Sequence, residues 1–153
     1  MVVPDITIAR EPVQDTEINR KEELVSEAGQ VGMYTPLRAS VNPRSILHAS
    51  ISCKWTLRSD RSQSSRTEAL NLIRNRKGRV PIVVAVVFEP LPMRITSIAF
   101  GTGDLDCVYH GALRELRQSV EELGSVDQKE MLDTLVQGRR LRDISDLPFD
   151  LAV

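Results

Sequence analysis

The sequence predicts an α/β domain with a central mixed β-sheet flanked by helices. Three observations support this prediction. Two short stretches alternate between apolar and polar residues, one continuous apolar run is typical of a buried strand, and later segments carry apolar residues at helical spacing. At 153 residues the chain is long enough to bury a core, and we expect a single domain over residues 1–153.

The N-terminal region is expected to begin with a strand. Residues 5–9 alternate, which places Ile6 and Ile8 on one face and Asp5 on the other. A short helix is predicted near residues 18–28, and the Gly- and Pro-containing residues 30–44 are predicted to form a loop.

The clearest strand is predicted over residues 46–55, because its apolar residues recur at every second position. We expect these residues to face the core and Lys54 to face away from it. If this strand pairs with the first one, a carboxylate (Asp5) and an ammonium (Lys54) share one surface. The expected core-facing residues are Leu47, Ala49, Ile51, Cys53 and Trp55.

The middle and C-terminal elements follow from apolar spacing and from glycine and proline positions. A helix is predicted over residues 65–77, and a central strand over 80–88 that ends at Glu89-Pro90-Leu91-Pro92. A further strand is expected over 94–100. The remaining predictions are a helix at 105–123, ended by Gly124, and a helix at 126–137, capped by Ser125 and ended by Gly138.

Composition excludes several classes of protein. No apolar run is long enough to span a bilayer, so we expect no membrane association. Two cysteines, Cys53 and Cys107, make neither a disulfide framework nor a zinc motif, which favours a reducing cytoplasm. The net charge is −1, yet residues 44–79 contain nine Lys or Arg and two acidic residues. This concentration is typical of a phosphate-binding surface or, alternatively, of a solvated basic face.

Three residues suggest phosphodiester hydrolysis. Carboxylates at Asp5 and Glu68 suit Mg²⁺, and Lys54 suits the charge that develops on a phosphoryl oxygen. Each has another explanation: Asp5 can belong to a turn and Lys54 can be solvated. Ser65 and Glu68 fit a helix capping box, and spacing alone favours this capping role for Glu68 over a catalytic one.

A compact cluster of Arg58, Asp60 and Arg61 suggests recognition of G·C base pairs. Arginine can donate two hydrogen bonds to guanine O6 and N7, and aspartate can accept one from cytosine N4. The alternative is a surface ion pair, which contributes little to stability.

Together these motifs resemble the NgoMIV-type type II restriction endonucleases, a group in the PD-(D/E)XK superfamily that recognises sites with a CCGG core. The pattern is Pro4-Asp5, a long gap, Ser52-Cys53-Lys54, thirteen intervening residues and then Glu68. This match favours Glu68 as an active-site acid that also caps its helix. The similarity covers nearly the whole chain, including residues 34–38, 74–78 and 143–148.

The resemblance implies a restriction-endonuclease-like core that cleaves double-stranded DNA with Mg²⁺ as cofactor, in a restriction–modification system. It also implies an assembly of two or four copies. The implied catalytic residues are Asp5, Lys54, Glu68 and Ser52, and the implied metal ligands are Asp5, Glu68 and the carbonyl of Cys53. The implied base-reading residues are Arg58, Asp60 and Arg61 for the CCGG core and Arg94 for the flanking pair.

Members of the group are longer, so we expect this chain to be the catalytic and recognition portion without the N-terminal portion. Two alternatives stay open. One is a truncated, non-catalytic DNA-binding remnant, and the other is an unrelated α/β interaction domain whose basic segment is only a solvated face.

Overall fold

The computed structural model describes residues 3–26, 28–101 and 103–152, without the side chains of residues 59–62. The chain falls into two compact units. One contains the N-terminal residues up to Thr7 and the residues from Ala49 onward, and the other is Ile8–His48.

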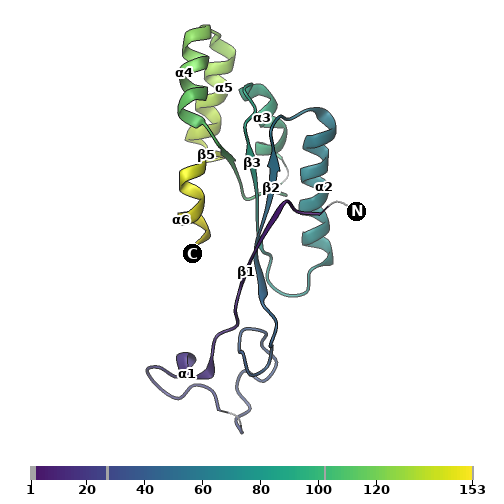
Figure 1. Cartoon of the computed structure of the whole chain (residues 1–153), viewed down its shortest axis with the longest axis vertical. Helices are drawn as coiled ribbons and strands as arrows, with labels where there is room; N and C mark the ends of the chain where they lie inside the picture. Colours follow the sequence, from purple (N-terminus) through teal and green to yellow (C-terminus); the bar gives the residue numbers. More distant parts are fainter. Residues whose placement is uncertain (1–2, 27, 102, 153) are drawn as a thin grey trace. The chain divides into compact units, whose positions relative to one another are not determined.

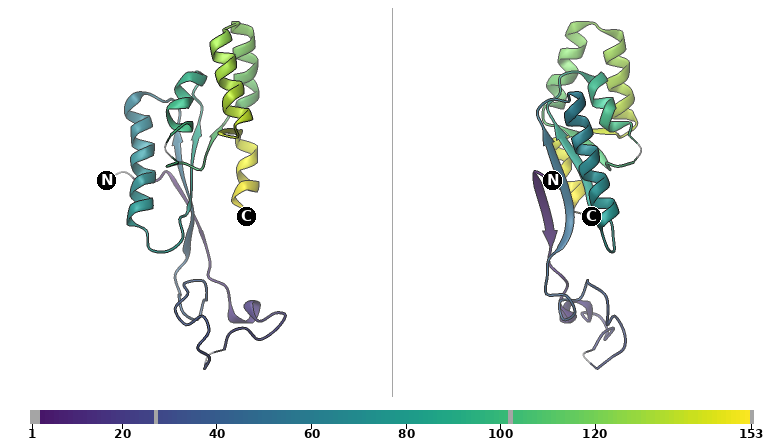
Figure 2. Two further views of the ribbon diagram at one scale, coloured as in Figure 1. Left: turned by 180° about the vertical axis from the view of Figure 1, so that it is seen from behind. Right: turned by 90° about the vertical axis from the view of Figure 1, so that its right-hand side faces the viewer.

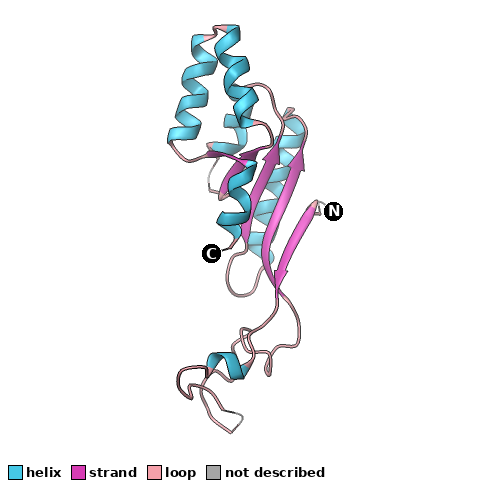
Figure 3. Ribbon diagram, turned by 60° about the vertical axis from the view of Figure 1, so that its left-hand side comes forward, coloured by secondary structure: helices cyan, strands magenta, loops and turns pink. Residues whose placement is uncertain are grey.

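Within the described residues, five strands form one mixed sheet in the order β1-β2-β3-β4-β5. Strands β2 to β5 run parallel to one another, whereas β1 runs in the opposite direction along the edge of β2 (Figure 3). The strands are β1 (Ile6–Arg10), β2 (Ile46–Lys54), β3 (Ile82–Val87), β4 (Cys107–His110) and β5 (Leu141–Asp143). The predicted fold class, a mixed sheet flanked by helices, is confirmed.

Helices cover both faces of this sheet. Figures 1 and 2 show α2 on one side of the strands and α6 on the other. The helices are α1 (Asp15–Ile18), α2 (Ser59–Asn75), α3 (Pro92–Ala99), α4 (Leu113–Leu123), α5 (Val126–Gln137) and α6 (Leu147–Leu151), with a 3₁₀ turn at Ile144–Asp146.

The main core lies on the α2 side of β3, where Val83, Ala85 and Val87 are buried. Apolar residues of α3, α4 and α5 belong to the same cluster, among them Ile95, Leu116 and Leu135. On the other face of the sheet, Tyr109 of β4 contacts helix α6. Its hydroxyl donates a 2.6 Å hydrogen bond to Asp150 Oδ2.

The second unit is organised by a buried guanidinium. Arg38 is 4% exposed and donates hydrogen bonds of 2.9 and 2.6 Å to the two carboxylate oxygens of Asp15. Its Nη1 also donates to the carbonyl oxygen of Val31 at 3.0 Å. The predicted helix at 18–28 is wrong, because Asn19 Oδ1 accepts from the backbone N–H groups of Leu24 and Val25 and holds a turn there.

Two element predictions around the candidate functional residues are also wrong. Helix α2 begins at Ser59, six residues before the predicted start, so Ser65 lies inside the helix and is not its N-cap. Residues 94–100 lie in helix α3 and its C-cap rather than in a strand. Pro92 at the first position favours this helix, and Ile95, Ile98 and Ala99 at helical spacing bury one face.

The predicted helix at 105–123 is partly wrong, because its first part is the strand β4 (Cys107–His110). Gly111 and Ala112 separate this strand from α4, which ends at Gly124 as predicted. Gly124 has φ 62°, a left-handed conformation that suits glycine. Strand β3 and helix α5 lie where the sequence predicted them.

The prediction for the faces of β2 is right only in part, because Ala49 and Ile51 are buried as predicted but the opposite face is buried too. Ser50 and Ser52 are buried on the α2 side, in register with Val83 and Ala85, whereas Cys53 is exposed. Serine can occupy this face because its side chain is small, and the Ser52 hydroxyl pairs with that of Ser65 under the helix.

Candidate functional site

Asp5 and Lys54 meet where β2 ends. Lys54 is the last residue of β2, and its Nζ donates a 3.0 Å hydrogen bond to Asp5 Oδ2. The backbone N–H of Cys53 donates a second hydrogen bond, of 2.7 Å, to the same oxygen. The structure thus brings together the carboxylate and the ammonium that strand alternation placed on one surface.

The Asp5 carboxylate is both ionised and accessible. The hydrogen bond from the Cys53 backbone, followed by that from Lys54, lowers the pKa of Asp5 below its ordinary value. Its side chain is 45% exposed, whereas that of Lys54 is 17% exposed. The Asp5 carboxylate is therefore open to a ligand from the solvent side.

Glu68 lies in the middle of α2 and is 3% exposed. Among the described residues, neither of its carboxylate oxygens has a hydrogen-bond partner. Burial raises the pKa of Glu68; the Lys54 charge opposes this rise and the Asp5 charge adds to it. The capping-box explanation of Glu68 is wrong, because the helix begins well before Ser65.

Ser52 and Cys53, the two residues before Lys54, have different environments. Ser52 is buried, and its hydroxyl oxygen lies 2.9 Å from that of Ser65 in α2. Cys53 is exposed, and the sequence-based prediction that its side chain packs in the core is therefore wrong. The metal-binding role predicted for Cys53 concerns its carbonyl oxygen, not its thiol.

The donor set at this site suits a hard cation. No group of three or more His, Cys, Asp or Glu side chains gathers at a metal site in the described part of the chain. Magnesium does not need such a group, because it keeps several water ligands and commonly binds one or two protein carboxylates. The unpaired oxygens of Glu68 and the exposed carboxylate of Asp5 fit this requirement.

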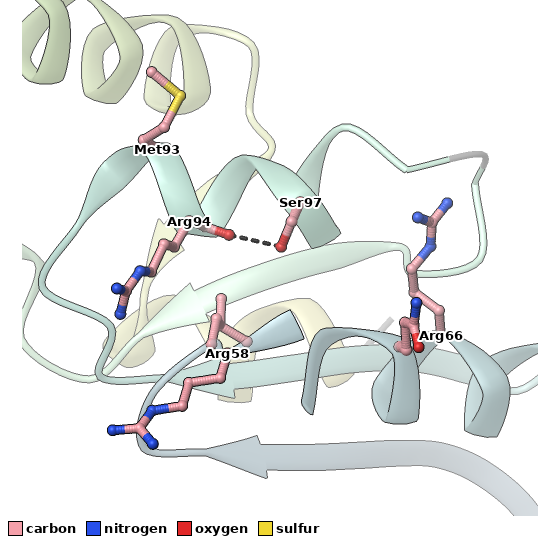
Figure 4. A pocket seen from close by; sticks show the side chains of 7 residues that line it. Arg58, Arg66, Met93, Arg94 and Ser97 are labelled. Carbon is pink, nitrogen blue, oxygen red and sulfur yellow. Dashed lines mark hydrogen bonds between the residues drawn. The ribbon is translucent and has the colours of Figure 1, made fainter. Parts of the chain in front are cut away.

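Arg58 and Arg94 line a second feature, an open cavity of about 770 Å³ between the start of α2 and α3. Arg58 is the N-cap of α2, and Arg94 lies in the first turn of α3. Figure 4 shows both guanidinium groups extending toward the same side. The side chains of Asp60 and Arg61 lie outside the described residues. The cavity is lined by Leu57, Arg58, Gln63, Arg66, Met93, Arg94 and Ser97.

Sequence reasoning missed Glu89, which was treated only as the end of a strand. It is fully buried, and its carboxylate accepts hydrogen bonds from the N–H groups of Leu57 (2.6 Å) and Leu91 (3.2 Å). A lone acid between an apolar strand and two prolines was the available signal.

Comparison with known proteins decides the family. The model of the NgoMIV restriction enzyme family matches residues 1–153. The chain belongs to the NgoMIV restriction enzyme family. A curated member, the type II restriction enzyme NgoMIV of Neisseria gonorrhoeae, is 55% identical over 152 residues. That alignment covers 99% of this chain and 52% of the relative, so the chain spans about half the relative's length.

A weaker similarity exists to a solved complex of the restriction endonuclease PspGI with its substrate DNA. It covers 68% of this chain and 39% of that one, at 20% identity and a TM-score of 0.44, and family membership does not depend on it. In the described residues, no helix is long and apolar enough to cross a membrane.

Proposed function

We propose that this chain carries the catalytic and DNA-recognition functions of a type II restriction endonuclease, hydrolysing double-stranded DNA with Mg²⁺ at a site with a CCGG core. The observation that carries the proposal is the buried, unpaired Glu68 carboxylate next to the Asp5–Lys54 ion pair. A buried carboxylate without partners costs free energy, which a bound cation would offset. Family membership supports the same assignment.

The chemistry divides among the residues of this site. Asp5, Glu68 and the carbonyl oxygen of Cys53 would hold Mg²⁺, which supplies positive charge for the phosphoryl group when bound. Lys54, mostly buried and ion-paired with Asp5, would place an ammonium beside a non-bridging phosphate oxygen as negative charge develops there. Ser52 would hold α2 against β2 through Ser65, beneath these groups.

DNA recognition is assigned to the cavity between α2 and α3. Arg58, with Asp60 and Arg61, would read the CCGG core, and Arg94 would read the flanking base pair. The geometry supports part of this proposal, because Arg58 and Arg94 line one open cavity despite being far apart in sequence. By family resemblance we further propose an assembly of two or four copies. From the cysteine content we propose that it acts in the cytoplasm.

The test uses the 153-residue chain on two matched duplexes, one with a CCGG core and one in which a G·C pair of that core is replaced. Cleavage of only the first duplex, in Mg²⁺ and not in Ca²⁺ or EDTA, is expected. Binding in Ca²⁺ should weaken as salt rises, because phosphate contacts release counterions.

Two outcomes would contradict parts of the proposal. Site-specific binding without cleavage would assign the chain as a DNA-binding remnant. Binding that is weak, insensitive to salt and indifferent to sequence would remove DNA as the partner.

A further inference from the structure

The inference concerns Glu89, which lies just beyond β3 and is 0% exposed. Both of its carboxylate oxygens are occupied. Leu57 N–H donates to Oε2 at 2.6 Å, and Leu91 N–H donates to Oε1 at 3.2 Å. A carboxylate is rarely buried so completely, and here backbone amides compensate its desolvation.

These two amides belong to the segments that carry Arg58 and Arg94, two of the arginines that line the cavity. Leu57 directly precedes Arg58, the N-cap of α2. Leu91 is the N-cap of α3, and the N–H of Arg94 donates to its carbonyl oxygen at 2.9 Å in the first turn. One carboxylate therefore connects the starts of both helices.

Glu89 also contacts one of the arginines directly. Arg94 Nη1 lies 3.7 Å from Glu89 Oε1, and the arginine side chain is 50% exposed while the glutamate is fully buried. The ion pair restrains the guanidinium at its terminal Nη1, while the side chain stays half exposed and lines the cavity.

Glu89 is itself anchored from β4. Ala112 N–H donates to His110 Nδ1 at 3.0 Å, so Nε2 carries the proton and donates to the carbonyl oxygen of Glu89 at 3.1 Å. Burial lowers the pKa of His110, which keeps this neutral form at physiological pH.

We propose that Glu89 is a positioning residue for sequence recognition, fixing Arg58 and Arg94 at the spacing that base-edge hydrogen bonds require. This inference rests on the proposed function. A bidentate contact from arginine to guanine needs two guanidinium N–H groups aligned with O6 and N7. A small displacement of either helix start therefore reduces discrimination between base pairs.

The test is Glu89→Gln, which keeps the size of the side chain. Its single carbonyl oxygen can accept from one of the two amides, while its NH₂ group faces the other amide and no longer attracts Arg94. We expect the ratio of affinities for cognate and one-pair-substituted duplexes, measured in Ca²⁺, to fall about 5- to 100-fold, the factor expected for one lost bidentate contact. Affinity for the substituted duplex should stay within about 2-fold, because phosphate contacts remain.

Asp106→Asn is the matched control. Asp106 Oδ2 accepts a 2.7 Å hydrogen bond from Val83 N–H at the opposite end of β3. A general loss of stability lowers both affinities together, so this variant should leave the ratio unchanged.

The outcomes separate the inference from the proposed function. A parent chain that does not prefer the cognate duplex contradicts the proposed function. If the parent discriminates and folded Glu89→Gln discriminates equally, only the role of Glu89 is overturned. If Glu89→Gln does not fold, amide hydrogen exchange of the parent decides: slow exchange at Leu57 and Leu91 supports the proposal, and exchange as fast as in a solvated loop overturns it.

Discussion

Two buried glutamates behave in opposite ways. Glu68, on α2, is 3% exposed and has no hydrogen-bond partner for either oxygen among the described residues. Glu89, after β3, is 0% exposed and has an amide donor on each oxygen and a guanidinium nearby. The two glutamates are therefore buried to a similar extent, and they differ in the number of hydrogen-bond partners of their carboxylates.

The difference indicates two kinds of buried charge. A carboxylate whose two oxygens each accept a backbone hydrogen bond has less capacity left for a ligand and stabilises the fold around it. A carboxylate left unpaired destabilises the chain by itself and keeps its oxygens available. Changes near Glu68 should therefore affect the chemical step, and changes at Glu89 should affect stability and recognition.

The largest effect is expected at Lys54. Lys54→Met keeps the aliphatic stem and removes the ammonium, and the single-turnover rate of cleavage in Mg²⁺ should fall by about 10²–10³-fold. Affinity for the cognate duplex in Ca²⁺ should change less than about 3-fold. Lys129→Met, at an exposed position of α5, is the control and should cleave at the parent rate. Cleavage by Lys54→Met at that same rate would exclude the ammonium from the mechanism.

Glu89→Ala should produce the next largest effect, on stability. It leaves the amides of Leu57 and Leu91 buried without acceptors, and each such loss costs about 1–3 kcal/mol. Urea denaturation should show a free energy of unfolding lower by about 2–4 kcal/mol in total. A change below about 0.5 kcal/mol would mean that water replaces the carboxylate without cost.

Glu68→Gln should have the opposite effect and raise the free energy of unfolding. Because burial raises the folded-state pKa of Glu68, protonation favours the folded chain, and the parent loses stability as pH rises through that raised value. The glutamine variant lacks this loss and should be more stable than the parent by about 1–3 kcal/mol at pH 8, without metal. The advantage should disappear as pH falls below 4.5, the ordinary glutamate value.

The measurement is urea denaturation of both chains at pH 8 and near pH 4, in EDTA. Cleavage by Glu68→Gln should be impaired at all pH values, so that stability and activity move in opposite directions. A variant less stable than the parent at pH 8 would show that Glu68 has a partner that compensates its charge.

Much of the first site could be predicted from the sequence, because strand alternation is a local pattern. Alternation placed Asp5 and Lys54 on one surface, and the structure brings them into hydrogen-bond contact. It could not tell how far along β2 each face is covered, since that depends on where the helices pack. Cys53 was therefore assigned to the core although it is exposed.

The cavity between α2 and α3 was harder to predict, because it depends on contacts distant in sequence. The segment at 94–100 was read as a strand, which hid the position of Arg94 in the first turn of α3. Glu89 was overlooked because its partner Leu57 is 32 residues away. Similarly, β4 was merged into the following helix, because four apolar or aromatic residues suit either element.

The smallest effect is expected at Ser52. Its hydroxyl pairs with Ser65, one turn before Glu68 on α2, so this contact sets how closely the helix that carries Glu68 approaches β2. Ser52→Ala removes one neutral hydrogen bond and should lower the free energy of unfolding by about 1 kcal/mol and the cleavage rate less than about 3-fold.

Ser50→Ala is the matched control for Ser52→Ala. Ser50 Oγ is buried on the same face of β2 and has no partner among the described residues, so its removal should be neutral or slightly stabilising. A loss of cleavage of about 10²-fold in Ser52→Ala, with stability unchanged, would instead place this hydroxyl in contact with the phosphate. The acid on α2 would then act with two neighbours from β2, Ser52 and Lys54, rather than with Lys54 alone.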